Sequence, residues 1–230
     1  MEEDRGAARI DGDPHRDTPV LHSGVSLRDA RAAMILLHGR GATAESILTL
    51  AGPLDAGGIA CFAPQAAGNT WYPSSFLAPI AQNEPWLSSA LAKLDRLVAM
   101  IGAGGVGPER LILLGFSQGA CLTLEHSARR PRRYGGIVGL SGGLIGPGRV
   151  DPGRYGSESF DGAPVFLGCS DVDPHIPLER VRETGEVLGR MGAAVDLRIY
   201  PGMGHQVNDD ELAAAREILR AAAAPARRSG

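Results

Sequence analysis

The chain has 230 residues, of which 43% are hydrophobic and 21% charged, a composition ordinary for a globular protein with one sizeable core. Its formal net charge of −3 provides no overall attraction to nucleic acid or to anionic membranes, so neither is an expected partner. No apolar run approaches the length of a membrane span, which argues against stable insertion into a bilayer.

The two ends of the chain differ in composition from the rest. The first 17 residues contain six acidic side chains and no apolar stretch of the kind that signal peptides carry. We expect residues 1–17 to form a disordered acidic tail, residues 18–224 a single folded domain, and residues 225–230 a second disordered tail.

Three cysteines, Cys61, Cys121 and Cys169, lie far apart in apolar stretches. Their spacing does not match that of metal ligands, so we expect buried thiols and no bound metal. Free thiols are typical of a reducing compartment, which predicts a cytoplasmic location.

Short, continuously apolar runs alternate with helical patterns along the chain. Continuous hydrophobicity is typical of strands that are covered on both faces, as in parallel sheets. The expected strands are 32–37, 59–63, 110–116, 136–140, 164–168 and 195–200, with a further strand near 19–26. The expected helices are 43–54, 85–101, 117–130, 178–191 and 209–223. This alternation predicts an α/β fold, with a mostly parallel central sheet and helices on both faces.

Ligands of such sheets bind at the carboxyl ends of the strands, so the residues that follow each strand are the first candidates for chemistry. Gly115, Ser117 and Gly119 form a G-x-S-x-G pattern directly after the strand 110–116 and at the start of a helix. A sharp strand-to-helix turn would expose the serine hydroxyl and would leave no room for side chains at the two glycines. The pattern predicts a nucleophilic serine; the alternative is a serine that only caps the helix.

His205 follows the last expected strand and precedes the last helix, in the segment Pro201-Gly202-Met203-Gly204-His205. An imidazole in this loop can lean over the sheet edge toward Ser117, accept the hydroxyl proton and return it to a leaving group. We therefore expect His205 to be the general base; the alternative is a loop histidine without a catalytic role.

Asp171 and Asp173 both follow the strand 164–168, so both are candidates for the carboxylate that orients the imidazole of His205. We prefer Asp173, because Asp-Pro-x-x-Pro favours a rigid turn before the next helix, and Asp171 stays as the alternative. The order Ser117, Asp173, His205 along the chain is the one expected of α/β-hydrolases. His175, which lies between the acids and that helix, is expected to line the pocket.

The loop His38-Gly39-Arg40-Gly41-Ala42 follows the first long strand. Stabilising a developing oxyanion needs two N–H donors, and the expected ones are the backbone amides of Arg40 and Gln118. The alternative for this loop is an ordinary glycine-rich turn.

Taken together, LLHGRGA, GFSQGA, DVDPHIP and YPGMGH resemble the phospholipase/carboxylesterase branch of the α/β-hydrolases, which includes the acyl-protein thioesterases. The resemblance covers residues 31–223. It implies the α/β-hydrolase fold with little or no cap domain, and a serine hydrolase that cleaves small esters or thioesters of short to medium acyl or aryl groups without a cofactor. Arg40 stands where the thioesterases usually carry an apolar residue, which argues against removal of long acyl chains from proteins.

The segment 68–74 is more similar to that of the bacterial carboxylesterases linked to resistance to hydroquinone and aromatic compounds. By this resemblance an acyl or aryl pocket is lined by Trp71, Tyr72, Phe76 and Trp86; the alternative is that these aromatic residues only pack the core. An exposed apolar rim around Phe76 and Leu77 is a candidate surface for a homodimer.

Two other functions share the fold. A lactone or dienelactone-type hydrolase has the same chain order, but that family predicts a cysteine where this chain has Ser117. A non-catalytic ligand-binding protein would be expected to lack one of the three catalytic side chains, and all three are present.

Overall fold

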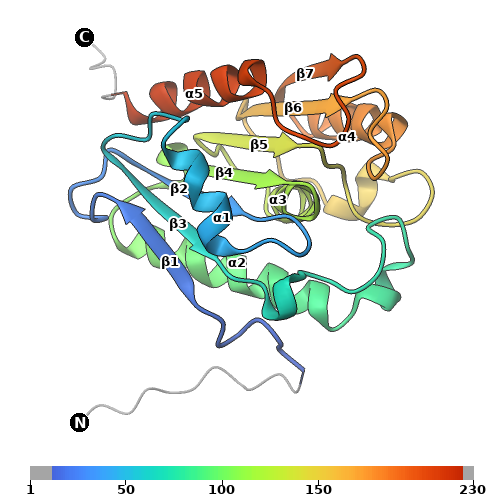
Figure 1. Ribbon diagram of the computed structural model, residues 1–230, viewed down its shortest axis with the longest axis horizontal. Helices are drawn as coiled ribbons and strands as arrows, with labels where there is room; N and C mark the ends of the chain where they lie inside the picture. The colour runs from blue at the N-terminus through green and yellow to red at the C-terminus, as the bar shows by residue number, and fades with distance from the viewer. Residues whose placement is uncertain (1–11, 225–230) are drawn as a thin grey trace.

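The structure is a computed structural model that describes residues 12–224; the expectations for residues 1–11 and 225–230 lie outside the described part. Within it, seven strands form one sheet in the order β1-β3-β2-β4-β5-β6-β7 (Figure 1). The antiparallel pair is β1 with β3, and all other neighbours are parallel. The strands are β1 (Val20–Gly24), β2 (Ala32–Leu37), β3 (Ile59–Pro64), β4 (Leu111–Phe116), β5 (Gly136–Leu140), β6 (Pro164–Ser170) and β7 (Ala194–Tyr200).

Five α-helices of residues 12–224 lie at the predicted places. They are α1 (Ala44–Leu48), α2 (Trp86–Ala103), α3 (Gln118–Arg129), α4 (Leu178–Arg190) and α5 (Asp209–Ala223). The helix α1 is shorter than expected because it tightens into a 3₁₀ turn at Thr49–Ala51 before Gly52 and Pro53, two residues that disfavour a continuing helix. No helix of the described part is long and apolar enough to span a membrane.

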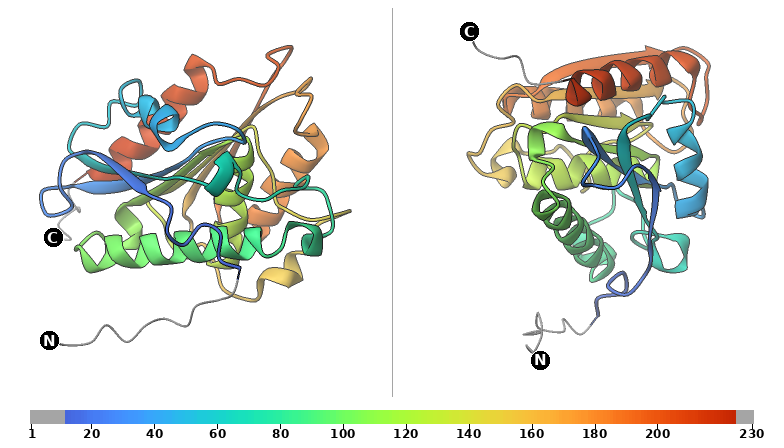
Figure 2. Two further views of the ribbon diagram at one scale, coloured as in Figure 1. Left: turned by 60° about the horizontal axis from the view of Figure 1, so that its bottom comes forward. Right: turned by 90° about the vertical axis from the view of Figure 1, so that its left-hand side faces the viewer.

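The sheet separates two apolar cores, as the alternation of side chains along β2 shows. Ile35 and Leu37 face the core formed with α2, α3 and α4, whereas Met34 and Leu36 face the core formed with α1 and α5. All four side chains are at most 2% exposed, because helices cover both faces of the sheet (Figure 2). The predicted arrangement of the sheet and its helices is confirmed.

Residues 12–17 differ from the expected disordered tail, because they pack along the domain beside α2 (Figure 2, left). His15 is fully buried, with its ring between those of Trp71 and Trp86 at centroid distances of 5.5 and 5.4 Å. The Ala67 amide donates to its Nδ1 at 3.0 Å, so Nε2 carries the proton and donates to the Trp71 carbonyl at 2.9 Å. Burial lowers the pKa of His15, which favours this neutral, doubly bonded form. The expected tail boundary at residue 17 is therefore wrong.

Glu211 is a buried carboxyl at the start of α5. The Asn208 amide donates to the Glu211 Oε2, and the Glu211 amide donates to the Asn208 Oδ1, both at 2.9 Å. This reciprocal pair is a capping box. The Glu211 Oε1 has no hydrogen-bond partner among the described residues and faces Gly168, where a Cβ would lie 2.2 Å from it. Burial raises the pKa of Glu211 from 4.5 to about 7.

We expect Glu211→Gln to stabilise the protein more at high pH than at low pH. Between pH 4.5 and about 7 the unfolded carboxyl is ionised while the folded one stays protonated, so folding loses about 1.4 kcal/mol per pH unit and the loss levels off above pH 7. Glutamine mimics the protonated acid and removes this loss. Denaturant unfolding at pH 5 and pH 8 should show a difference in the variant's effect of about 2–3 kcal/mol.

The matched control is Glu217→Gln, which replaces an exposed carboxyl on the same helix and should change the free energy of unfolding by less than about 0.5 kcal/mol at either pH. An equal effect of Glu211→Gln on the free energy of unfolding at both pH values would contradict the assigned pKa.

Candidate active site

Ser117 occupies the sharp turn between β4 and α3. Its backbone has φ 56° and ψ −122°, a strained conformation for a residue with a side chain. A Cβ at Gly119 would lie 2.2 Å from the Leu37 carbonyl oxygen, and one at Gly115 would lie 2.3 Å from the Gly119 carbonyl oxygen. Neither position accepts a side chain, so the steric reason predicted for the two glycines is confirmed.

His205 lies in the loop between β7 and α5 and connects two side chains that are distant in the sequence. Its Nδ1 is 2.7 Å from the Asp173 Oδ2, and its Nε2 is 2.9 Å from the Ser117 Oγ. A carboxylate at Asp173 requires the proton on Nδ1, which leaves Nε2 to accept the hydroxyl hydrogen of Ser117. The ring also packs against Phe116, at a centroid distance of 4.9 Å.

The carboxyl group of Asp173 has no exposed area and is held by several donors. Its Oδ1 accepts hydrogen bonds from the amides of His175 and Ile176 at 2.8 and 3.0 Å. Burial by itself raises the pKa of Asp173, but the hydrogen bonds from His205 and from the two amides outweigh burial and hold the pKa below its usual value. Asp173 is therefore a charged carboxylate aimed at the imidazole.

Asp171, the alternative acid, has a different set of contacts. It is exposed, and its Oδ1 accepts from the Gly202 amide at 2.8 Å. The hydroxyl of Ser170 similarly accepts from the Gly204 amide at 3.0 Å. These two bonds connect the loop after β6 to the loop that carries His205. Asp171 supports the imidazole's loop, whereas Asp173 contacts the imidazole itself.

His38, at the end of β2, fixes the backbone of the glycine-rich loop. The Ala66 amide donates to its Nε2 at 3.1 Å, so the proton lies on Nδ1, which donates to the Gly39 carbonyl at 2.8 Å. Burial lowers the pKa of His38 and keeps the ring neutral. Because the C=O and N–H of one trans peptide point in opposite directions, this bond turns the Arg40 amide away from His38.

The backbone of this loop approaches the serine closely. A Cβ at Gly39 would lie 3.3 Å from the Ser117 Cβ. The Gln118 amide belongs to the first residue of α3 and therefore has no partner within the helix. The two amides expected to bind an oxyanion, those of Arg40 and Gln118, thus belong to residues that line the same cavity as Ser117.

Comparison with known proteins identifies the family of the chain. Residues 25–223 match the model of the family described as Phospholipase/Carboxylesterase. The chain belongs to this family of α/β-hydrolases. It is accordingly an esterase-type hydrolase with the α/β-hydrolase fold.

Individual relatives are consistent with the assignment. A crystal structure of a phospholipase/carboxylesterase from Dyadobacter fermentans is 44% identical, with a TM-score of 0.85 over 88% of this chain and 97% of that one. Acyl-protein thioesterase 1 of Saccharomyces cerevisiae is 29% identical over 220 residues, which are 84% of this chain and 93% of the relative. Acyl-protein thioesterase 1 of Gibberella zeae is 34% identical over 116 residues, so that match spans about half of each chain.

In this member of the family, a cavity of about 420 Å³ opens beside Ser117. Three of the residues expected in the pocket line it, namely Tyr72, Phe76 and His175. Phe76 is only 7% exposed and Leu77 is half-buried, so the exposed apolar rim expected around them is absent. The surface proposed for a homodimer therefore loses its basis.

Trp71 and Trp86 do not line the cavity, contrary to expectation. Trp71 is fully buried, and its indole N–H donates to the His38 carbonyl at 2.9 Å. Trp86 packs edge-on against His15. The alternative of core packing is correct for these two residues, since the rings of both pack against His15.

The sequence did not predict four of the residues that line the cavity: Ser75, Phe116, Cys121 and Ile176. Cys121 follows Ser117 by one helical turn, so the predicted helix contained the signal that places it at the cavity. Phe116 directly precedes the serine. Ser75 and Ile176 lie in loops, and no periodic pattern predicts which way a loop residue points.

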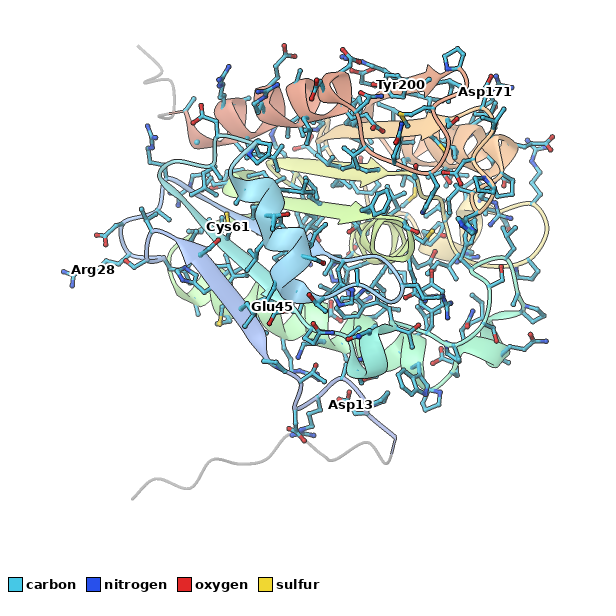
Figure 3. All side chains as sticks on the ribbon, viewed as in Figure 1. Asp13, Arg28, Glu45, Cys61, Asp171 and Tyr200 are labelled. Carbon is cyan, nitrogen blue, oxygen red and sulfur yellow. The ribbon has the colours of Figure 1, made fainter. Side chains whose placement is uncertain are left out.

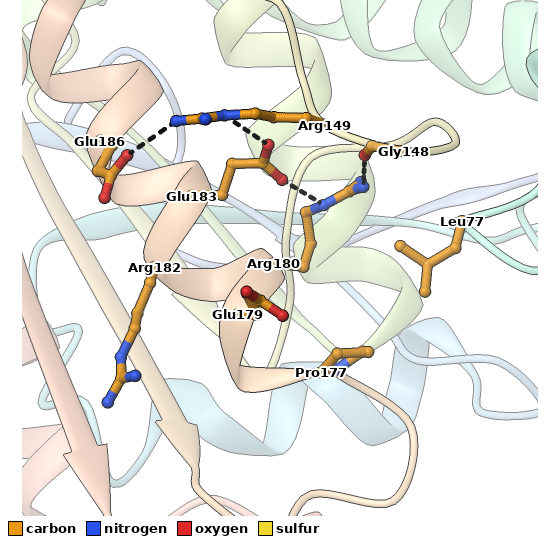
Figure 4. A pocket seen from close by; sticks show the side chains of 9 residues that line it. All are labelled: Leu77, Gly148, Arg149, Pro177, Glu179, Arg180, Arg182, Glu183 and Glu186. Carbon is orange, nitrogen blue, oxygen red and sulfur yellow. Dashed lines mark hydrogen bonds and ion pairs between the residues drawn. The ribbon is translucent and has the colours of Figure 1, made fainter.

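A larger cavity, of about 590 Å³, lies elsewhere, against α4 (Figure 4). Arginines and glutamates line it: Arg149, Arg180, Arg182, Glu179, Glu183 and Glu186. Arg180 donates to the Leu144 carbonyl and pairs with Glu183 at 2.9 Å, which anchors the neighbouring loop to the helix. No residue of the expected catalytic set lines this cavity, so its size alone does not mark it as the active site.

Proposed function

We propose that the chain cleaves carboxylic esters or thioesters through an acyl-enzyme formed on Ser117. The observation that carries this proposal is the continuous hydrogen-bonded chain from Ser117 through His205 to Asp173, with distances of 2.9 and 2.7 Å. A nucleophile, a base and an orienting carboxylate in this geometry are the parts that acyl transfer requires.

The chemistry follows from the positions of the protons. As Ser117 attacks the acyl carbon, His205 accepts the hydroxyl proton and the carbonyl oxygen becomes an oxyanion facing the amides of Arg40 and Gln118. The tetrahedral intermediate then expels the alcohol or thiol, which takes the proton from the imidazole. Water, activated by His205 in the same way, releases the acid and regenerates the serine. Asp173 remains a carboxylate throughout and stabilises the imidazolium.

The cavity supports short to medium acyl or aryl groups as substrates. Its walls include the rings of Tyr72 and Phe76, and Cys121 lies among its buried lining residues. The cationic side chain of Arg40 stands at the same cavity, where a long apolar chain would have to desolvate it. The relatives named acyl-protein thioesterase make small thioesters an equal candidate.

A series of p-nitrophenyl esters from acetate to decanoate tests the substrate size. We expect kcat/KM to be highest at butyrate to hexanoate and to fall about tenfold or more by decanoate, because a cavity of this size does not enclose the longer chain. A steady rise through decanoate would contradict the proposal. Opening of dihydrocoumarin without cleavage of the alkyl esters would favour the lactone-hydrolase alternative.

Location is a separate proposal. We place the protein in a reducing compartment, the cytoplasm, which is supported by the three free and buried cysteines.

A further inference from the structure

Among the residues 12–224 that line the catalytic cavity, Arg40 is the one that carries a permanent charge. The other lining residues are apolar, neutral polar or histidine. The carboxylate of Asp173, close to the site, has no exposed area and is already bonded to His205 and to backbone amides. The guanidinium carbon of Arg40 lies 6.0 Å from the ring centroid of Tyr72, which lines the cavity, so a bound substrate meets a cation there without an acidic wall opposite it.

The guanidinium of Arg40 is held in place without being neutralised. Its Nη1 donates to the Pro73 carbonyl at 2.9 Å, and its Nη2 donates to the carbonyls of Tyr72 and Ser74 at 3.0 and 2.8 Å. Carbonyl groups orient the guanidinium but carry no net charge, and no ion pair joins Arg40 to a carboxylate among residues 12–224. Three of its five N–H groups are used, so two remain to donate to a ligand.

The order of strands determines which part of a substrate meets this charge. Arg40 follows β2, on one side of the strand β4 that carries Ser117, whereas His205 follows β7 on the other side. The leaving group departs beside the imidazole that protonates it. The acyl part consequently extends toward the wall formed by Arg40, Tyr72 and Phe76.

We propose that Arg40 determines substrate specificity by favouring acyl groups that end in a carboxylate, such as half-esters of dicarboxylic acids. This proposal rests on the proposed esterase function and adds a substrate class to it. The charge at the cavity would also disfavour the long apolar chains for which the site offers little room.

The test compares the p-nitrophenyl monoester of adipic acid with the matching adipamate, in which a neutral amide replaces the carboxylate. In the wild type we expect kcat/KM to be about fivefold higher for the adipate at low ionic strength, mainly through KM, and this preference should shrink at high salt. Arg40→Met should abolish the preference, and Arg40→Lys, which keeps the charge, should retain part of it.

The ratio between the two substrates separates recognition from structure. If Arg40 only clamps the loop at Tyr72, Pro73 and Ser74, its loss slows both substrates equally and leaves the ratio unchanged. Arg28→Met is the matched control, because Arg28 is exposed and precedes β2, at the opposite end of the strand from Arg40 (Figure 3). It removes one positive charge and should leave the ratio unchanged.

A wild-type ratio near one, or a ratio that Arg40→Met does not lower, would overturn the proposal. If Arg40→Met loses all activity, Arg40→Gln replaces it as the uncharged variant. The ratio of kcat/KM values in the wild type, and its dependence on salt, test the proposal without any variant. Failure of the esterase proposal is distinguishable, because the wild type would then cleave neither substrate, or Ser117→Ala would still cleave both.

Discussion

Ser117→Ala is expected to lower kcat for p-nitrophenyl butyrate by about 10⁶-fold, with little change in the free energy of unfolding. Removing the hydroxyl removes the atom that would form the acyl-enzyme, and His205 then has no proton to accept. In other serine hydrolases the loss of the nucleophile costs about this much, and the activity that remains comes from binding and the oxyanion donors. Steady-state kinetics on the purified variant, with its far-UV spectrum as a check of folding, measures the effect.

Ser75→Ala is the matched control for this prediction. Ser75 also lines the cavity, and its hydroxyl accepts a hydrogen bond from the Leu77 amide at 3.2 Å, but it does not contact the imidazole. We expect this variant to retain activity within a few-fold of the wild type. Ser117→Ala activity above about one hundredth of the wild-type value would exclude Ser117 as the nucleophile.

Asp173→Asn is expected to lower kcat by about 10⁴-fold. An amide at this position can still accept hydrogen bonds from the backbone amides of His175 and Ile176, so the fold should persist. It can donate to Nδ1, however, which places the imidazole proton on Nε2 and prevents that atom from accepting the hydroxyl hydrogen of Ser117. The imidazolium that forms during attack would also lose its counter-charge.

Asp171→Asn distinguishes the two acids. Its side chain supports the Gly202 amide rather than the imidazole, and an asparagine oxygen can accept the same hydrogen bond. We expect this variant to lose less than about tenfold in kcat. If Asp171→Asn proved the more damaging of the two, the assignment of Asp173 as the acid that orients His205 would be wrong.

The sheet and the serine turn could be predicted from the sequence because their requirements are local. The strand β2 is continuously apolar over AAMILL, and both faces of it are buried. The turn at Ser117 needs two flanking glycines within five residues, and both glycines pack against backbone atoms. Local rules of this kind apply without knowledge of the rest of the fold.

The features that were missed depend on contacts between distant segments. Trp71 does not line the cavity; its ring packs against His15, 56 residues earlier in the chain, which also bonds to its carbonyl. The Asp-Pro-x-x-Pro pattern favoured Asp173 over Asp171 as the acid beside His205, but it did not predict that Asp171 would accept a hydrogen bond from the Gly202 amide. The sequence contained the residues of these contacts but no signal for their pairing.

The most direct test of Ser117 as an activated nucleophile is mass spectrometry of the protein after reaction with a fluorophosphonate. We expect a single adduct on the tryptic peptide that contains Ser117, and we expect its rate of formation to fall by several orders of magnitude in His205→Ala. An unmodified protein, or an adduct on a serine other than Ser117, would contradict the hydrogen-bonded chain as the source of catalysis.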